Sequence, residues 1–222
     1  LEAAEVTVNG NVHQTSGTVK GLGQSSLTVN GNYVQSAGEL EVYNATLDIQ
    51  GNYEQKGGYW VASNAVVNIG GNYQMGYIDS KGNFTYESYS DAEIFENSVL
   101  NIGQNWYFYR SGDYSHLEDC TVNIAGTEFL YYFGLECYSS AKINFTGTEN
   151  LKLTNKGSYT FGSPTVEIQN AENRVVTISG NFNFSELNGE NITMKSENGG
   201  IGIGKFTDVL TINGDVLFFG SP

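Results

Sequence analysis

The sequence predicts an all-β fold, a single-stranded parallel β-solenoid of about ten rungs with one aromatic-rich insertion. Three observations lead to this fold: a motif that recurs every 20 or 21 residues, short runs in which apolar and polar residues alternate, and corners rich in Gly and Asn. The composition agrees, because 28 of the 222 residues are Gly and only 15% are charged. Low charge with many Val, Thr and Tyr residues is typical of a β-rich domain rather than of a helical or disordered chain.

The repeat is clearest near the N-terminus. Four segments read apolar-x-apolar-x-Gly-Asn followed by Val or Tyr, and they start at Val6, Leu27, Leu47 and Val67, with spacings of 21, 20 and 20 residues. Further along these units, glutamine and glycine each recur at equivalent positions. Weaker copies extend the pattern over nearly the whole chain, starting at Leu100, Val122, Ile143, Val166, Val176, Ile192 and Leu210.

Each unit holds two short alternating runs, which is the periodicity of a strand with one buried face. The Asn-Gly steps between the runs also suit hairpins, so an antiparallel meander or sandwich is the alternative. We favour stacked coils because equivalent side chains recur at one fixed period. No helical segment interrupts the series, which excludes βαβ units.

Equivalent residues of stacked parallel coils form ladders along the axis, with neighbouring rungs about 4.8 Å apart. We expect amide groups to hydrogen-bond from rung to rung and aromatic rings to stack. The columns are the asparagines Asn32, Asn52, Asn72 and Asn105, the aromatic residues Tyr33, Tyr53, Tyr73 and Trp106, and the glutamines Gln14, Gln35 and Gln55.

The pattern describes one solenoid domain over residues 1–222. Residues 1–75 form regular repeats, 76–96 an insertion, 97–147 aromatic-rich rungs and 148–222 degenerate repeats. Because the chain starts and stops within the pattern, we expect it to be a segment of a longer protein whose flanking repeats are its immediate partners.

The repeated Leu/Val-x-Val/Ile-x-Gly-Asn-Tyr step, followed by Gln-x-x-Gly, resembles the haemagglutinin repeats of filamentous-haemagglutinin-type bacterial exoproteins and adhesins. The likeness is best from Val6 to about Tyr73 and partial over the remainder. It implies a right-handed β-helical fibre that is secreted or held on the bacterial cell surface. Its relatives include adhesins and the stalks that carry toxins to neighbouring cells.

Aromatic residues crowd into the insertion and the rungs that follow it. Insertions in solenoids emerge as loops on one face, often the binding face, and rigid aromatic rings suit contact with a glycan or a protein receptor. The alternative is that the insertion packs along the rod. The candidate binding residues are Tyr77, Tyr86, Tyr89, Trp106, Tyr107, Tyr109, Tyr114, Tyr131 and Tyr132.

The two cysteines, Cys120 and Cys137, are 17 residues apart, on successive rungs of the predicted coil. They could pair and staple this region in an oxidising exterior, or they could stay free.

Charge and motifs exclude several function classes. A net charge of -14 opposes binding to nucleic acid or to an anionic membrane surface. The sequence has no zinc, nucleophile-elbow, phosphate-loop or calcium-repeat motif, so we expect no catalytic residue, no cofactor and no metal. A glycan hydrolase would need two convergent carboxylates, for which the candidates are Asp91, Glu93, Glu96, Asp113, Glu118 and Asp119.

These observations predict a structural segment of a secreted or cell-surface bacterial fibre or adhesin. It would act as a stiff stalk that presents adhesive or effector modules and is not itself an enzyme. The alternative is a binding module that recognises a cell-surface glycan or protein receptor through the aromatic insertion, and a glycan-active β-helix enzyme is a distant third.

Overall fold

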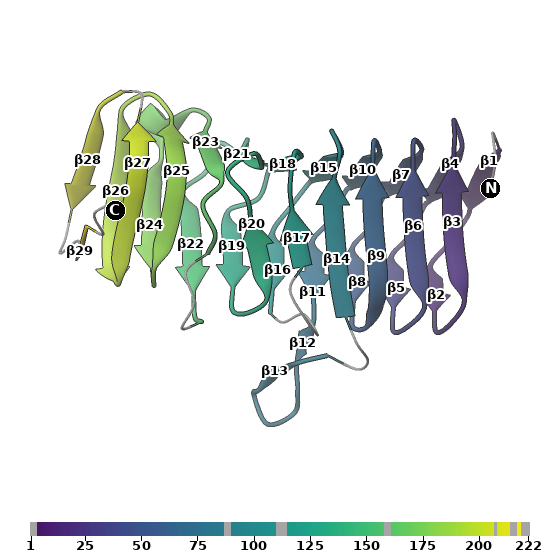
Figure 1. The fold of residues 1–222 in the computed structure, drawn as a ribbon. Helices are drawn as coiled ribbons and strands as arrows, with labels where there is room; N and C mark the ends of the chain where they lie inside the picture. The colour runs from purple at the N-terminus through teal and green to yellow at the C-terminus, as the bar shows by residue number, and fades with distance from the viewer. Residues whose placement is uncertain are drawn as a thin grey trace.

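The protein is described here by a computed structural model that covers residues 4–86, 90–109, 115–157, 161–206, 208–213 and 217–218. The chain winds into a rod of stacked coils whose strands form three parallel sheets, of eleven, ten and six strands (Figure 1). The predicted β-solenoid is thus confirmed. Among the described residues, one 3-10 turn, η1 (Ala171–Asn173), is the only helical element, and no helix is long and apolar enough to cross a membrane.

Each sheet collects one strand from successive coils. Sheet 1 comprises β1 (Glu5–Val8), β4 (Ser26–Val29), β7 (Thr46–Ile49), β10 (Val66–Ile69), β15 (Val99–Ile102), β18 (Thr121–Ile124), β21 (Lys142–Phe145), β23 (Thr165–Ile168), β25 (Phe182–Asn188), β27 (Gly200–Phe206) and β29 (Leu217–Phe218). Sheet 2 comprises β2 (Val12–Gln14), β5 (Tyr33–Gln35), β8 (Tyr53–Gln55), β11 (Tyr73–Met75), β16 (Trp106–Phe108), β19 (Glu128–Tyr131), β22 (Leu151–Asn155), β24 (Val175–Ser179), β26 (Ile192–Asn198) and β28 (Leu210–Asn213). Sheet 3 comprises β3 (Thr18–Leu22), β6 (Glu39–Tyr43), β9 (Gly58–Ser63), β14 (Ser90–Phe95), β17 (Ser115–Leu117) and β20 (Leu135–Cys137).

The coils stack in the register that the repeat predicts. Tyr33 pairs with Tyr53, Tyr53 with Tyr73, and Tyr73 with Trp106. Inward-facing residues of all three sheets meet in one continuous core, as alternation along each strand requires. A buried Leu or Ile in this core stabilises the fold by about 2–3 kcal/mol, so each added coil extends the core and strengthens the rod.

The asparagine of a Gly-Asn corner hydrogen-bonds to the equivalent asparagine of the preceding coil. The backbone N–H of Asn32 donates to Asn11 Oδ1 at 2.8 Å, and Asn32 Oδ1 in turn accepts the N–H of Asn52 at 2.8 Å. The same bond continues from Asn72 to Asn52 and from Asn105 to Asn72. The predicted asparagine ladder is therefore confirmed, with a main-chain donor and a side-chain acceptor in each rung.

Glycine precedes Asn32, Asn52 and Asn72 because there is no room for a side chain. A Cβ on Gly31 would collide with Asn11 Oδ1, and a Cβ on Gly51 would collide with Asn32 Oδ1. The ladder and the glycine are thus two parts of one contact between neighbouring coils.

Tyrosine and glutamine form a second, buried ladder. The Tyr53 hydroxyl donates to Gln35 Oε1 of the previous coil at 2.6 Å, and Gln35 Nε2 donates to the carbonyls of Gly38 and Tyr59 at 3.0 Å each. Tyr33 with Gln14 and Tyr73 with Gln55 repeat this arrangement. The tyrosine thereby satisfies the glutamine, and the glutamine ties sheet 2 to the start of sheet 3.

The aromatic column stacks only in part. Tyr53 and Tyr73 are stacked at 5.2 Å with 14° between their planes, and Tyr73 and Trp106 at 5.8 Å with 13°. Tyr33 instead meets Tyr53 edge to face at 86°, which corrects the expectation of a continuous stack. Both geometries are favourable for aromatic pairs, because they bring ring edges or offset faces together.

A further amide ladder lies on the outer face of sheet 1. Asn68 Nδ2 donates to Asp48 Oδ1, and each later asparagine donates to the one before it at 2.7 Å, through Asn101, Asn123 and Asn144. Asp48 is a fitting first member, because an ionised carboxylate accepts and does not donate. Sequence reasoning did not single out this column.

Two boundaries differ from expectation. Ser90–Phe95 is strand β14, paired residue for residue with β9, so it belongs to a regular coil and the insertion ends before it. Toward the C-terminus, the last described strand of sheet 3 is β20, whereas sheets 1 and 2 continue. The degenerate repeats of the C-terminal region therefore correspond to coils with two sheets.

Candidate functional site

The insertion leaves the rod as a β-hairpin (Figure 1). Strands β12 (Tyr77–Ile78) and β13 (Phe84–Thr85) pair in antiparallel fashion. The Asp79 carboxylate holds the turn by accepting the backbone N–H groups of Lys81 and Asn83, both at 2.8 Å. These hydrogen bonds to the charged form lower the pKa of Asp79. The hairpin tip is thus a locally ordered, solvent-exposed structure.

The base of the hairpin packs against aromatic residues that directly follow strands β16 and β19 of sheet 2. Phe84 stacks on Tyr109 at 5.3 Å and lies 4.5 Å from Tyr132, while Tyr107 stacks on Tyr109 at 5.9 Å. We call Phe84, Tyr107, Tyr109 and Tyr132 the hairpin aromatic cluster. All four side chains are half-buried, so each presents part of its ring to solvent.

Polar neighbours orient this cluster. The Tyr107 hydroxyl accepts a hydrogen bond from Asn105 Nδ2 at 3.0 Å and donates to Glu128 Oε2 at 3.4 Å. Burial, with the nearby Glu128 carboxylate, raises the pKa of Tyr107. Lys156 Nζ lies 5.6 Å above the Phe84 ring. Neutral hydroxyls, half-exposed ring faces and one ammonium group form a surface suited to recognition by stacking and hydrogen bonding.

The structure divides the predicted binding residues into three groups. Tyr77, Tyr86, Tyr107, Tyr109 and Tyr132 are half-buried and lie on the hairpin or on sheet 2 beside it. Trp106 and Tyr131 are 1% and 2% exposed and lie in the core, so their prediction as binding residues is wrong. Tyr89 and Tyr114 lie outside the described residues.

Strand alternation explains the two errors. Trp106 is in register with inward-facing Tyr73, and its neighbour Tyr107 faces out. Tyr131 pairs with inward-facing Phe108. The period-2 pattern in the sequence already contained this information, because it assigns Trp106 to the buried tyrosine column.

The two cysteines are free and buried, so the staple considered from the sequence is not formed. Cys120 lies just before β18 and Cys137 ends β20. Burial raises the pKa of Cys120 to about 12 and raises that of Cys137 well above its usual range. Both thiols are therefore protonated at neutral pH and have little nucleophilic character.

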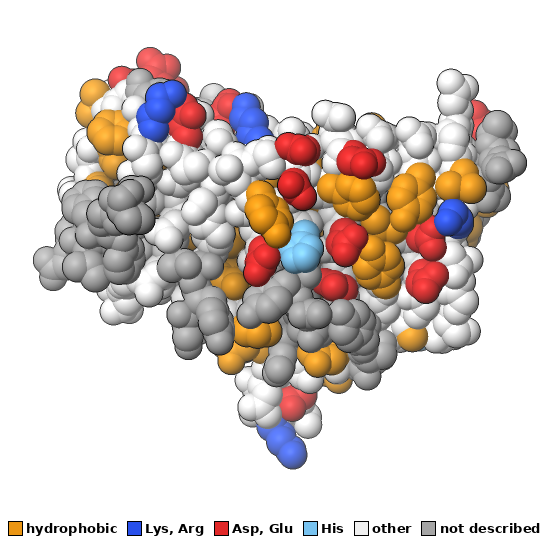
Figure 2. All heavy atoms as spheres, in the orientation of Figure 1, with side chains coloured by type: hydrophobic (Ala, Val, Ile, Leu, Met, Phe, Trp, Pro, Cys, Tyr) orange, Lys and Arg blue, Asp and Glu red, His pale blue; other side chains and the backbone are white. Residues whose placement is uncertain are grey.

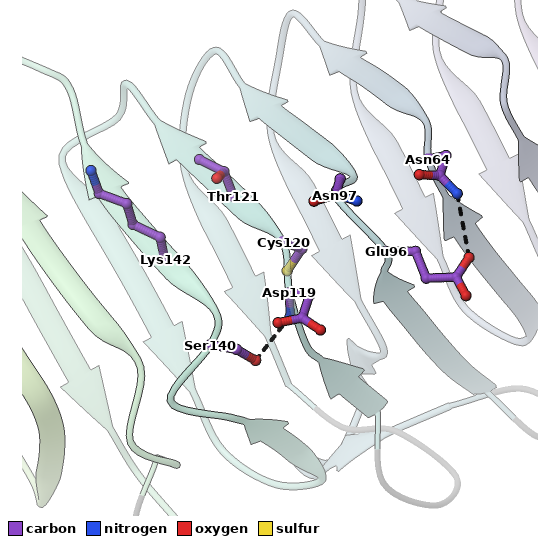
Figure 3. A pocket seen from close by; sticks show the side chains of 8 residues that line it. All are labelled: Asn64, Glu96, Asn97, Asp119, Cys120, Thr121, Ser140 and Lys142. Atoms are coloured by element: carbon purple, nitrogen blue, oxygen red, sulfur yellow. Dashed lines mark hydrogen bonds between the residues drawn. The ribbon is translucent and has the colours of Figure 1, made fainter.

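A hollow of about 640 Å³ lies at the corner between sheets 3 and 1 (Figure 3). Glu96 and Asp119 lie on its wall, each with a left-handed backbone at φ 53° and 45°. Glu96 Oε2 accepts hydrogen bonds from Ser63 Oγ and Asn64 Nδ2. The remaining lining residues are Asn97, Cys120, Thr121, Ser140 and Lys142. Within the described part of the chain, no group of three or more His, Cys, Asp or Glu side chains could hold a metal ion.

The carboxylates considered for hydrolysis lie in different environments. Asp91 is buried, accepts hydrogen bonds from Ser115 Oγ at 2.9 Å and its neighbour's N–H at 3.0 Å, and has its pKa raised by burial. Glu93 Oε2 accepts the Tyr59 hydroxyl at 2.8 Å. Glu118 is exposed, and Asp113 lies outside the described residues.

The outer side of sheet 3 forms a second surface, which the sequence did not single out. Figure 2 looks onto it and shows acidic and hydrophobic side chains interspersed over β6, β9, β14, β17 and β20. We call this surface the acidic face. Its carboxylates are Glu39, Glu41, Glu93, Glu118 and Glu136, and its rings are Tyr43, Tyr59, Phe95 and Tyr138.

No protein-family model, curated protein or solved structure matches the chain. What it can do is therefore inferred from its own side chains and their arrangement.

Proposed function

We propose that this chain is a stiff structural segment of a secreted or cell-surface bacterial fibre or adhesin, which holds adhesive or effector modules away from the cell. The observation that carries the proposal is the continuity of the stack. In sheet 1 every strand from β1 to β29 pairs with its counterparts in the neighbouring coils. The ten spacings between the eleven strands of sheet 1, at about 4.8 Å each, give a rod about 50 Å long.

Three kinds of ladder resist bending and extension in this rod. Backbone hydrogen bonds, the Tyr–Gln pairs and the asparagine ladders all run parallel to the axis, so a stretching force loads many bonds at once. The surface carries excess negative charge, which disfavours lateral association of rods. A spacer needs both properties.

The proposal is tested by single-molecule force spectroscopy on the chain held between two handles. We expect no extension until coils unfold in steps at a well-defined force. Gradual extension at low force, like that of a flexible linker, would contradict a stalk role. A protease-accessibility experiment on intact source cells checks location: a surface segment is cleaved by added protease, whereas a protein inside the cell is protected.

The hairpin aromatic cluster favours a second function, recognition of a glycan or protein receptor. Stacked rings on a projecting hairpin offer rigid contact area at low entropic cost. Replacing residues 77–89 by one glycine reproduces the corner formed by Lys56, Gly57 and Gly58 in the previous coil. The rod should therefore fold without its hairpin.

A glycan array probed with the parent chain and with this variant tests recognition. Binding that the variant loses, and that Tyr138→Ala on the acidic face retains, would support the hairpin site. Equal binding by parent and variant, or absence of binding by either, would refute it and leave the structural role.

A further inference from the structure

Three strands of the acidic face carry a glutamate followed two residues later by an aromatic ring. The pairs are Glu41 with Tyr43 on β6, Glu93 with Phe95 on β14, and Glu136 with Tyr138 at the end of β20. Residues i and i+2 of a strand face the same side, so each pair offers a carboxylate beside a ring. The pairs occupy alternate coils, which separates them by about 9.6 Å along the rod.

Register aligns the carboxylates in one column. This column reads Lys20, Glu41, Val61, Glu93, His116 and Glu136 from β3 to β20. Consecutive glutamates are thus always separated by a residue that is not acidic, which limits their mutual repulsion.

The chain itself shows what the first pair holds. Lys20, from the preceding coil, forms an ion pair with Glu41, and its Nζ lies 5.3 Å above the Tyr43 ring. One ammonium group therefore meets a carboxylate and a ring face together. Both contacts favour a cation, the first through charge and the second through the ring quadrupole.

The third pair has a similar intramolecular neighbour. His116 Nε2, also from the preceding coil, lies 3.5 Å from Glu136 Oε2, which is an ion pair when the imidazole is protonated. The His116 ring lies 6.0 Å from the Tyr138 ring.

The middle pair differs, because the coil before it supplies Val61 and Ser63 at the equivalent positions. Glu93 accepts a hydrogen bond from the neutral Tyr59 hydroxyl, and Phe95 is half-buried. Glu93 and Phe95 thus repeat the first pair without a lysine in the coil before them. Val61 lies on the outer face but is only 1% exposed, so neighbouring side chains cover it and it offers no charge to Glu93.

We propose that the acidic face docks a lysine- or arginine-bearing segment of a partner protein, with one cationic side chain held between the Glu93 carboxylate and the Phe95 ring. This interaction is separate from the stalk role and from the hairpin aromatic cluster. It identifies the partner by chemistry: a basic protein segment.

Charge over the wider face supports this choice of partner. The acidic face carries five glutamates. Within the described strands of sheet 3, Lys20 is the one lysine or arginine that offsets their charge. Lys56, Lys142, Lys152 and Lys205, by contrast, lie on or beside sheets 1 and 2, where each forms an ion pair with a glutamate. The acidic face therefore concentrates the negative potential that steers and retains a basic segment.

The test uses the whole chain and a fluorescein-labelled hexalysine peptide, followed by fluorescence anisotropy at low and at physiological salt. Hexalysine acetylated on every side chain is the uncharged control peptide. We expect hexalysine to bind, the acetylated peptide not to bind, and added salt to weaken binding because exposed charges are screened.

Two variants locate the site. Glu93→Gln removes the charge but keeps an acceptor for Tyr59, and Phe95→Ser introduces the residue that Ser63 already places in this column. Each should weaken hexalysine binding about threefold to tenfold. Glu54→Gln is the matched control, since it removes one glutamate charge from sheet 2 and should change binding less than about twofold.

Three results would refute the proposed site on the acidic face. If Glu93→Gln and Glu54→Gln weaken binding equally, the attraction is diffuse and the proposed site is wrong. If hexalysine does not bind at low salt, or if the acetylated peptide binds as well, the cationic partner is refuted. Circular dichroism of each variant, matched to the parent, excludes loss of fold as the cause.

Discussion

Replacing Gln35 by leucine tests whether the Tyr–Gln ladder stabilises the stack. Gln35 is fully buried and makes three hydrogen bonds, one from the Tyr53 hydroxyl and two to backbone carbonyls at the start of sheet 3. At about 1 kcal/mol each, and about 1 kcal/mol more for the tyrosine hydroxyl left without its acceptor, the loss is about 3–4 kcal/mol. That is a large part of the 5–15 kcal/mol that typically stabilises a domain.

Substituting Tyr53, the partner of Gln35, isolates the hydrogen bond between the two side chains from the other effects of Gln35→Leu. Tyr53→Phe removes only the hydroxyl and should cost about 1–2 kcal/mol, because the Gln35 carbonyl oxygen is left unsatisfied in the core. The double variant should be less destabilised than the sum of the two single variants by about 1 kcal/mol. Such coupling is expected only if the two groups bond each other directly.

Urea unfolding followed by far-ultraviolet circular dichroism measures all three variants. Gln50→Leu is the control, because Gln50 lies at an exposed corner of the coil that carries Tyr53. The reasoning is refuted if Gln35→Leu costs no more than Gln50→Leu. It is also refuted if the two substitutions at the ladder are additive within about 0.3 kcal/mol.

Three further substitutions probe other features of the stack. Glu167→Asn should raise the free energy of unfolding in urea by about 0.5–1 kcal/mol. The new amide offers a donor to the buried Asn144 Oδ1, which has no partner among the described residues, and the variant loses one partly exposed ion pair. A net loss of stability would show that the amide ladder does not stabilise the stack. Gly58→Ala should lower stability by about 2–3 kcal/mol, because its φ is +89° and a Cβ would collide with a carbonyl of the previous coil. The control Gly82→Ala, at φ +83° with open space around it, should cost about 1 kcal/mol. Equal losses in thermal unfolding would rule out the collision. Burial raises the pKa of Asp91, so the stability contributed by its protonated form is complete below the ordinary aspartate pKa and is lost as the pH rises through the raised value. Asp91→Asn should therefore match the parent Tm in acid and exceed it at neutral pH, and a constant difference across the pH range would contradict this assignment.

The regular repeats were predictable because each column has one physical role. The tyrosine, asparagine and glutamine columns recur at a fixed period, so their alignment follows from counting residues. Their hydrogen bonds do not: nothing in the spacing says that the Tyr53 hydroxyl reaches back one coil to Gln35. That contact depends on how the two sheets meet inside the rod.

The errors have physical causes that can be traced. The spacing of the repeats predicts an insertion over residues 76–96, although Ala92 and Ile94 alternate as an inward-facing strand requires. The cysteine spacing could not reveal whether the two thiols face each other. The acidic face was missed because its signal, glutamate-x-aromatic on alternate coils, becomes visible only when the coils are aligned in register.

The asparagine ladder gives the stack a direction. From Asn11 to Asn105, the amide oxygen of one coil accepts a backbone N–H of the coil after it, as Asn11 does from Asn32 and Asn32 from Asn52. A chain that emerges with its N-terminus first therefore presents a finished template before the next coil arrives. The coils can therefore fold one after another from the N-terminus, before the C-terminal part of the chain is present.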